Sequence, residues 1–453
     1  MSRSLMVRLG AGTAALAALA AVLVAAPPQS AVADLSSGEA VPAAAVVARR
    51  IPYAMFGMHP AQVAGALSPE QLAGVTPASG LGAVTIITNG ADWRDIQPTS
   101  TLDANFASLD SAIDNARSQG VTQINVVLSG TPCWAAATAT RSAEVPRCYA
   151  SAPKSYTSWR RFVTLTLRHI AARVSSVQVW AEADLPARWA GTPTQLAFMT
   201  KIVNDVARTP AVTALNPKLV VASASTTTRL KLTRGNYLDR FWYPYVRALG
   251  AYKWPVQAFV GNFYPLSNGS PLNRQAQIAA FKAVLVKARA PRLPVWEGEI
   301  NYGVPGGGLP YRNLNSTLGA AYVARTYVDN LRFGIARSYW SAWMPQNRGY
   351  GITMWPGTIG ARAQLTTYGW LAGKWFKGCG TSNLATGRFV TCLVTTTAVA
   401  TSFTARIVYS EGRTRTYVVP SGVTKVCYAS GTCLAVTRGQ VIKVGQLPAW
   451  LGQ

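Results

Sequence analysis

Short apolar runs alternate with amphipathic stretches along most of the chain. Eight of these runs are continuously apolar and rich in β-branched and aromatic residues, which predicts strands buried on both faces. The runs occupy residues 52–58, 83–88, 123–129, 176–180, 218–223, 256–261, 293–297 and 336–343. Stretches with helical spacing lie between several of them, at residues 101–120, 155–174, 192–210, 274–290 and 316–334. The chain therefore predicts an α/β fold with a parallel sheet.

The number and order of these units favour a (β/α)8 TIM barrel over residues 52–372. An open, doubly wound sheet is the alternative. No predicted strand-turn-helix unit carries a GxGxxG or GxxxxGK[ST] phosphate loop, which counts against that alternative. The three glycines at 306–308 stand between prolines, and we interpret them as a loop.

The two ends of the chain have a different character. Residues 373–453 contain short β-branched runs with turns and no helical period, which predicts a small antiparallel, β-sandwich-like domain. Residues 1–33 combine a basic start, an apolar run and the small-x-small sequence Ala31-Val32-Ala33, as a secretory signal peptide does. A membrane anchor is the alternative, but the run is short for a span. Residues 34–51 are expected to be a linker.

Composition adds the expected location and partners. The formal net charge is +26, and the 43 basic residues are not gathered into a nucleic-acid-binding module. We expect a secreted or cell-envelope protein, with no membrane span after signal cleavage, that is attracted to anionic envelope polymers rather than to nucleic acid. Its six cysteines form three sequence-local pairs, and we expect each pair to close its own loop, although 15 pairings are possible.

Few carboxylates are available for chemistry. Glu182 directly follows the fourth predicted strand, and Glu297 and Glu299 end the seventh. Barrel enzymes carry their reacting groups at these strand ends, and two carboxylates facing each other are the arrangement of a retaining glycosidase. Because strands alternate with a period of two, Glu297 and Glu299 are expected to share a face, with Glu297 as neighbour or as the alternative nucleophile.

Several motifs resemble those of clan A glycoside hydrolases, especially secreted actinobacterial members similar to families 39 and 5. Asp92-Trp93-Arg94-Asp95-Ile96-Gln97-Pro98 looks like the W-x-x-I-x-P motif, and Gly130-Thr131-Pro132-Cys133-Trp134 is similar to G-T-P-x-W. The stretches 179–185 (VWAEADL) and 295–301 (VWEGEIN) stand where the family has V-W-N-E-P-N-L and W-x-T-E. The resemblance covers most of residues 52–372, and a trailing β domain also occurs in this group.

This resemblance implies that Glu182 is the acid/base and Glu299 the nucleophile of a retaining enzyme that cleaves O-glycosidic bonds in a cell-wall or environmental polysaccharide. It implies neither a metal nor an organic cofactor. The residues expected to contact the carbohydrate are His59, Trp134, Asp184, Asn262, Tyr264, Glu297, Trp340 and Trp343.

Three departures from the family pattern keep a second hypothesis open. Ala181 replaces the usual Asn before the acid/base, Asn262 replaces a His, and the second strand lacks the usual Arg. Each missing group removes a contact that strengthens in the transition state. The alternative function is therefore a barrel of the cell envelope that binds glycans with weak or no turnover.

Overall fold

A computed structural model describes most of the chain after its first 47 residues. The described residues are 48–59, 80–88, 90–99, 104–143, 145–229, 238–306, 308–341, 349–384, 387–398 and 405–453. The predicted signal peptide and Trp343 lie outside them. Within these ranges, no helix has both the length and the apolar character needed to cross a membrane.

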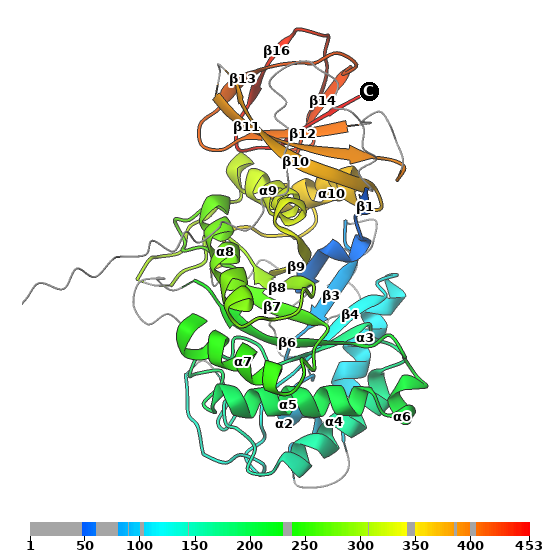
Figure 1. The fold of residues 1–453 in the computed structure, drawn as a ribbon, viewed down its shortest axis with the longest axis vertical. Coiled ribbons are helices and arrows are strands. Elements are labelled where there is room, and N and C mark those ends of the chain that lie inside the picture. The colour runs from blue at the N-terminus through cyan, green and yellow to red at the C-terminus, as the bar shows by residue number, and fades with distance from the viewer. Residues whose placement is uncertain are drawn as a thin grey trace, which may run out of the picture.

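Eight parallel strands close into a barrel, which confirms the predicted fold and excludes the open sheet (Figure 1). Every strand coincides with one of the predicted apolar runs. They are β2 (Phe56–His59), β3 (Ala83–Ile86), β4 (Gln123–Leu128), β5 (Ser176–Val179), β6 (Val220–Thr227), β7 (Ala258–Asn262), β8 (Val295–Ile300) and β9 (Ile335–Ser341). The β2–β9 pairing completes the closure, with His59 opposite Ser341.

Helices surround the barrel and connect its strands. The short ones are η1 (Tyr53–Met55), α2 (Trp93–Ile96), α6 (Pro210–Thr213) and η3 (Leu238–Trp242). The long ones are α3 (Ala107–Ser118), α4 (Tyr156–Ile170), α5 (Pro193–Ala207), α7 (Tyr243–Ala251), α8 (Pro271–Lys287), α9 (Thr317–Phe333) and α10 (Ile359–Leu371).

Local sequence explains where these helices begin and end. A capping box between Thr192 and Gln195 starts α5, with Pro193 in its first turn. Gly334, in the left-handed conformation at φ 66°, ends α9. The chain can therefore turn directly from α9 into β9.

An antiparallel sheet follows the barrel, as the sequence predicts. Its strand order is β1-β10-β11-β12-β17-β14-β15, and β13 pairs separately with β16. The bounds are β1 (Arg49–Arg50), β10 (Trp375–Leu384), β11 (Gly387–Thr395), β12 (Ala405–Ser410), β13 (Arg415–Val418), β14 (Lys425–Tyr428), β15 (Cys433–Ala435), β16 (Val441–Val444) and β17 (Ala449–Gly452).

One expectation about the linker is wrong. Arg49 and Arg50 pair with Phe376 and Trp375, so the end of the predicted linker is an edge strand of the C-terminal sheet. Two residues are too short to show a strand period in the sequence, and their partners lie more than 300 residues away. Figure 1 shows this dark blue strand beside the orange β10.

Polar contacts join the barrel to the sheet along α9. Tyr409 Oη on β12 donates to Asp329 Oδ1 at 2.7 Å, and Arg332 pairs with Glu411 at 2.9 Å. The Arg325 guanidinium lies 3.9 Å from the centroid of the Tyr409 ring, in cation–π geometry. These contacts fix the sheet against the helix that precedes β9.

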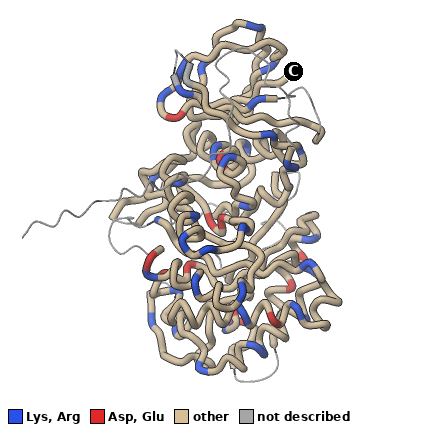
Figure 2. The backbone as a smooth tube through the Cα atoms, in the orientation of Figure 1, with Lys and Arg blue, Asp and Glu red and all other residues tan. Residues whose placement is uncertain are grey.

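The cysteines pair within their own loops, as expected. The disulfides are Cys133–Cys148, Cys379–Cys392 and Cys427–Cys433. Figure 2 shows Lys and Arg positions spread over both the barrel and the sheet, in keeping with the dispersed charge of the sequence.

Candidate active site

Glu182 is held in an unusual backbone conformation at the end of β5. Both Trp180 (φ 71°) and Glu182 (φ 50°) have positive φ, which is uncommon for residues other than glycine. Neighbouring strands hold this turn: Trp180 N donates to Leu128 O at 3.0 Å, and Glu182 N donates to Ser225 Oγ at 2.9 Å. Such strain persists only where the surroundings enforce it, and it is concentrated at functional sites.

Asp184 holds the same turn against β6. Its carboxylate accepts hydrogen bonds from Thr227 N at 2.7 Å and Thr227 Oγ1 at 2.5 Å. The pKa of Asp184 is raised to about 7, mainly by burial; the Thr227 hydrogen bonds oppose this rise, and the nearby charge of Glu182 adds to it. Both oxygens of Asp184 are thus engaged by Thr227, which fixes residue 184 against β6.

The end of β7 connects the two predicted catalytic carboxylates. Asn262 Nδ2 donates to Glu182 Oε1 at 3.3 Å, and Tyr264 Oη donates to Glu299 Oε2 at 2.9 Å. Asn262 and Tyr264 are only two residues apart, so Glu182 from β5 and Glu299 from β8 converge on one short segment. The structure thus brings together four of the residues that the sequence predicts for the site.

Glu299 lies in a poorly solvated position. Its side chain is buried. Burial, and to a smaller extent repulsion from the charge of Glu182, raises the pKa of Glu299 to about 8. The Tyr264 hydrogen bond and the positive charge of Arg188 lower that pKa in part. The negative charge of Glu182 therefore disfavours ionisation of Glu299.

Glu297 is placed differently from the prediction. It is fully buried, and its two oxygens accept from Arg274 Nε and Nη2 of α8, each at 2.7 Å. The three steps along β8 from Glu297 to Ile300 are matched by only two along β9, from Ser338 to Trp340, and this bulge interrupts the expected alternation. The expectation that Glu297 lies beside Glu299 and contacts substrate is therefore wrong, and Glu297 forms a structural ion pair.

His59 lies at the end of β2, inside the barrel. It is fully buried, and burial lowers the pKa of His59 to about 4, so the ring is neutral at pH 7. Neither ring nitrogen has a hydrogen-bond partner among the described residues, and the same is true of Asn262 Oδ1. Buried polar atoms without partners are rare in native proteins, and each calls for an explanation such as a ligand or water.

The family-like motifs after β3 and β4 pack against each other. Trp134 Nε1 donates to Gln97 O at 2.9 Å, and the Trp134 ring meets Trp93 edge to face, with centroids 5.6 Å apart. Asp92 Oδ1 accepts from Ser129 Oγ at 2.7 Å. Trp134 is half-buried and therefore partly exposed to solvent, whereas Trp340 is fully buried in the core.

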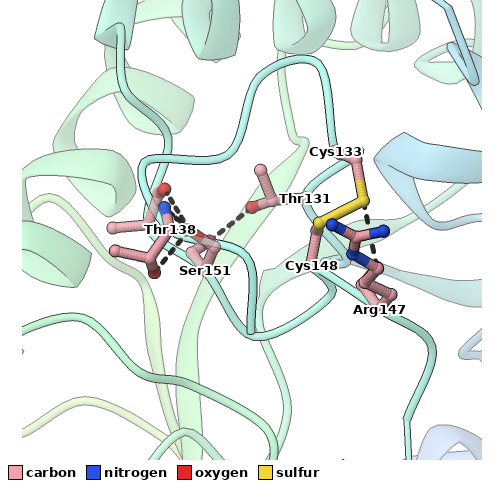
Figure 3. Close-up of a disulfide and its surroundings, with 7 residues drawn as sticks. Thr131, Cys133, Thr138, Arg147, Cys148 and Ser151 are labelled. Carbon is pink, nitrogen blue, oxygen red and sulfur yellow. Dashed lines mark hydrogen bonds between the residues drawn. A yellow bond between two sulfur atoms is a disulfide. The ribbon is translucent and has the colours of Figure 1, made fainter. Parts of the chain in front are cut away.

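A disulfide fixes the loop that carries Trp134. Figure 3 shows Cys133 bonded to Cys148, while Thr131 and Thr138 contact Ser151 across the same loop. Thr131 Oγ1 donates to Ser151 O at 2.6 Å, and Thr138 N donates to Ser151 Oγ at 3.0 Å. The loop is therefore closed at its base by covalent and polar contacts.

Sequence reasoning missed three residues at this end of the barrel. Ser225 supports the Glu182 backbone, and Arg188 Nε lies 3.9 Å from Glu182 Oε2. Arg229, just beyond β6, donates from Nη2 to Val304 O in the loop after β8. Both arginines follow predicted strands within a few residues, and that position could have identified them.

This chain resembles known proteins in its fold. No protein-family model and no curated protein matches the sequence. A family 39 glycoside hydrolase from Bacteroides cellulosilyticus WH2 is similar at TM-score 0.65 and 15% identity, over 89% of this chain and 81% of that chain.

Two further solved structures share the barrel and sheet. A GH39 β-xylosidase from Caulobacter crescentus is similar at TM-score 0.59 and 11% identity, over 89% of this chain and 97% of that one. A GH30 endoxylanase from Clostridium papyrosolvens C71 is similar at TM-score 0.56 and 13% identity, over 90% and 98%. The chain therefore has the fold of these glycoside hydrolases.

Proposed function

We propose that the protein is a secreted retaining glycoside hydrolase that cleaves O-glycosidic bonds in a cell-wall or environmental polysaccharide. The observation that carries this proposal is the convergence of Glu182 and Glu299 on Asn262 and Tyr264. Two carboxylates from different strands of a barrel, each held by a side-chain donor, fit a double displacement. The fold likeness to glycoside hydrolases and the three disulfides are compatible with the proposal.

In the proposed reaction, the Glu299 carboxylate attacks the anomeric carbon while Glu182 protonates the departing glycosidic oxygen. This step forms a covalent glycosyl-enzyme and leaves Glu182 ionised. Glu182 then takes a proton from water, whose oxygen attacks the same carbon and displaces Glu299. Tyr264 stabilises the leaving carboxylate through the hydrogen bond that it already donates.

A panel of aryl glycosides with gluco, galacto, manno, xylo and arabino configurations tests this function. We expect hydrolysis of at least one member, with the first-formed sugar retaining the anomeric configuration of the substrate in a proton NMR time course. Inversion would contradict the double displacement. Glycan binding with no turnover on the panel or on polysaccharides would instead favour the second candidate, a binding barrel.

That second candidate is supported by two specific features of the site. Ala181 precedes Glu182, and the pKa of Glu299 is raised to about 8 by burial and by Glu182. A nucleophile must be ionised to attack, so a raised pKa disfavours its reactive form at neutral pH. Glycan affinity without turnover, unchanged in Glu182→Gln, would be its signature.

The pH dependence of kcat/KM follows from the raised pKa of Glu299. Glu299 must be ionised to attack, so we expect kcat/KM to rise about tenfold per pH unit as the pH increases towards about 8 and to level off above it. Tyr264→Phe removes a bond that favours the Glu299 carboxylate. This variant should shift the pH-dependent part of the kcat/KM profile to higher pH and lower kcat by about 10- to 100-fold.

A matched variant isolates that effect. Tyr428→Phe removes a hydroxyl that donates to Lys443 O at 3.2 Å in the C-terminal domain, and it should leave both kcat and the pH profile unchanged. If the kcat/KM profile of Tyr264→Phe changes at the same pH as that of the wild type, Glu299 does not govern the titration.

A further inference from the structure

Helix α8 packs directly behind the segment that holds both carboxylates. Asn262 and Tyr264 each donate to one of the two carboxylates. Phe263, between them, meets Phe281 of α8 edge to face, with ring centroids 5.3 Å apart. The contact is close, since a Cβ built on Gly261 would lie only 2.9 Å from the Phe281 ring. The two donors therefore face the site while the residue between them packs against the helix.

Gln277 of α8 fixes the backbone at the end of this segment. Its Nε2 donates to Tyr264 O at 2.8 Å and to Thr228 O at 3.2 Å. Both carbonyls lie just beyond the last strand residues, which are Thr227 in β6 and Asn262 in β7. Gln277 is buried, and because both partners are acceptors, the amide nitrogen rather than the amide oxygen must face them. One side chain therefore joins the ends of β6 and β7.

Thr228 adds a second bond to the same segment. Its Oγ1 donates to Asn262 O at 3.0 Å, and the Thr228 side chain is buried. Buried side-chain donors thus hold the backbone carbonyls on both sides of Phe263. A shift of the segment away from β6 and α8 would break both of these bonds.

The same face of α8 also holds β8. Arg274 lies one turn before Gln277, and its guanidinium pairs with Glu297 at 2.7 Å. Glu297 is only two residues before Glu299 in the chain. Residues three apart on a helix lie on one face, so Arg274 and Gln277 act from the same side of α8. This face therefore contacts both the strand that carries Glu299 and the strand end that carries its hydrogen-bond donor.

From these contacts we infer that Gln277 is a positioning residue for the proposed hydrolase: through the backbone of Tyr264 it holds the hydroxyl that donates to Glu299. This inference rests on the proposed function. A hydrogen bond weakens steeply when its distance and angle are lost, and a carboxylate that loses a donor is less stable in its charged form. Loss of the Gln277 amide should therefore resemble a partial loss of the Tyr264 hydroxyl.

Carbon NMR of isotope-labelled glutamate carboxyls tests this role without relying on turnover. The chain has only seven glutamates, and Glu299→Gln assigns the Glu299 signal. Gln277→Met keeps a similar side-chain length without a donor, and we expect it to raise the pKa of Glu299 by about 0.5–1 unit. Gln275→Met removes an amide of the same helix that donates to Asp329 at 3.1 Å, and it should leave that pKa unchanged.

A double variant shows whether Gln277 acts through Tyr264. Tyr264→Phe should raise the pKa of Glu299, and adding Gln277→Met should raise it no further, because the hydroxyl that Gln277 positions is then absent. The charges of Glu182 and Arg188 also act on Glu299, and none of these variants removes them. Additive shifts, or a folded Gln277→Met chain with the wild-type titration, overturn the inference.

If Gln277→Met does not fold, Gln277→Asn replaces it. Its amide is one methylene group shorter and cannot span both carbonyls, so the pKa of Glu299 should shift in the same direction. Wild-type titration in this variant overturns the inference as well.

Kinetics connect the role to the reaction and separate it from the function on which it rests. With the best aryl glycoside at pH 7, Gln277→Met should lower kcat about 3- to 10-fold and change KM less than about twofold. A Gln277-dependent titration of Glu299 without hydrolysis of any glycoside supports the positioning role and contradicts the enzyme. Hydrolysis by the wild type with no effect of Gln277→Met on the titration supports the enzyme and overturns the positioning role.

Discussion

Replacing Glu299 with alanine should reduce turnover of the best aryl glycoside by about 10⁴-fold or more. Removal of the nucleophile eliminates the covalent route, and the residual rate then comes from binding and acid catalysis alone. Sodium azide should restore part of the rate, because a small anion can occupy the space of the lost carboxylate and attack the anomeric carbon. The product should be a glycosyl azide of inverted configuration.

Glu182→Ala provides the complementary measurement. Loss of a general acid/base lowers the rate of hydrolysis by about 10²- to 10⁴-fold, and by less for substrates whose leaving group needs no proton. Azide should here give a glycosyl azide of retained configuration, because it attacks the glycosyl-enzyme. Azide rescue of Glu297→Ala with no rescue of Glu299→Ala would assign the nucleophile to Glu297 and contradict our interpretation.

The second large effect is expected in stability, at the ion pair between Glu297 and Arg274. Both side chains are fully buried, and Asn330 Oδ1 also accepts from Arg274 Nη2 at 2.6 Å. Glu297→Ala would leave the guanidinium buried without its counter-charge. We expect the free energy of unfolding, measured by urea denaturation at pH 7, to fall by about 3–5 kcal/mol.

Two further variants show whether the lost charge is responsible. The double variant Arg274→Met with Glu297→Leu replaces the pair by apolar groups and should recover much of the loss. Asp114→Ala breaks a pair with Arg173 in which the aspartate side chain is 63% exposed, and it should cost less than about 1 kcal/mol. A loss at Glu297 as small as at Asp114 would contradict the proposed role.

Much of the fold could be predicted from the sequence, because each barrel strand is a separate apolar run and parallel strands are buried on both faces. The pairing of Glu182 and Glu299 could be expected for a related reason, since strand ends meet at one end of a barrel. The cysteine pairs followed from short spacing.

The errors arose where long-range packing overrides local periodicity. The position of Glu297 depends on a bulge in β8, and neither the bulge nor the Arg274 partner is visible in the local alternation. The contact of Asp184 with Thr227, 43 positions along the chain, is likewise invisible in the local sequence. Arg188 and Arg229 were missed because carboxylates and aromatic residues, rather than bases, were sought at the strand ends.

The pairing of Arg49 and Arg50 with β10 affects how the two domains can be treated. The chain passes through the C-terminal sheet before it enters the barrel at β2. Cutting the gene at residue 372 would therefore not yield an independent barrel, because it would remove the partner of β1 and expose α9 where Asp329 and Arg332 contact Tyr409 and Glu411. During synthesis β1 must also wait until the whole barrel has emerged before its partner β10 follows.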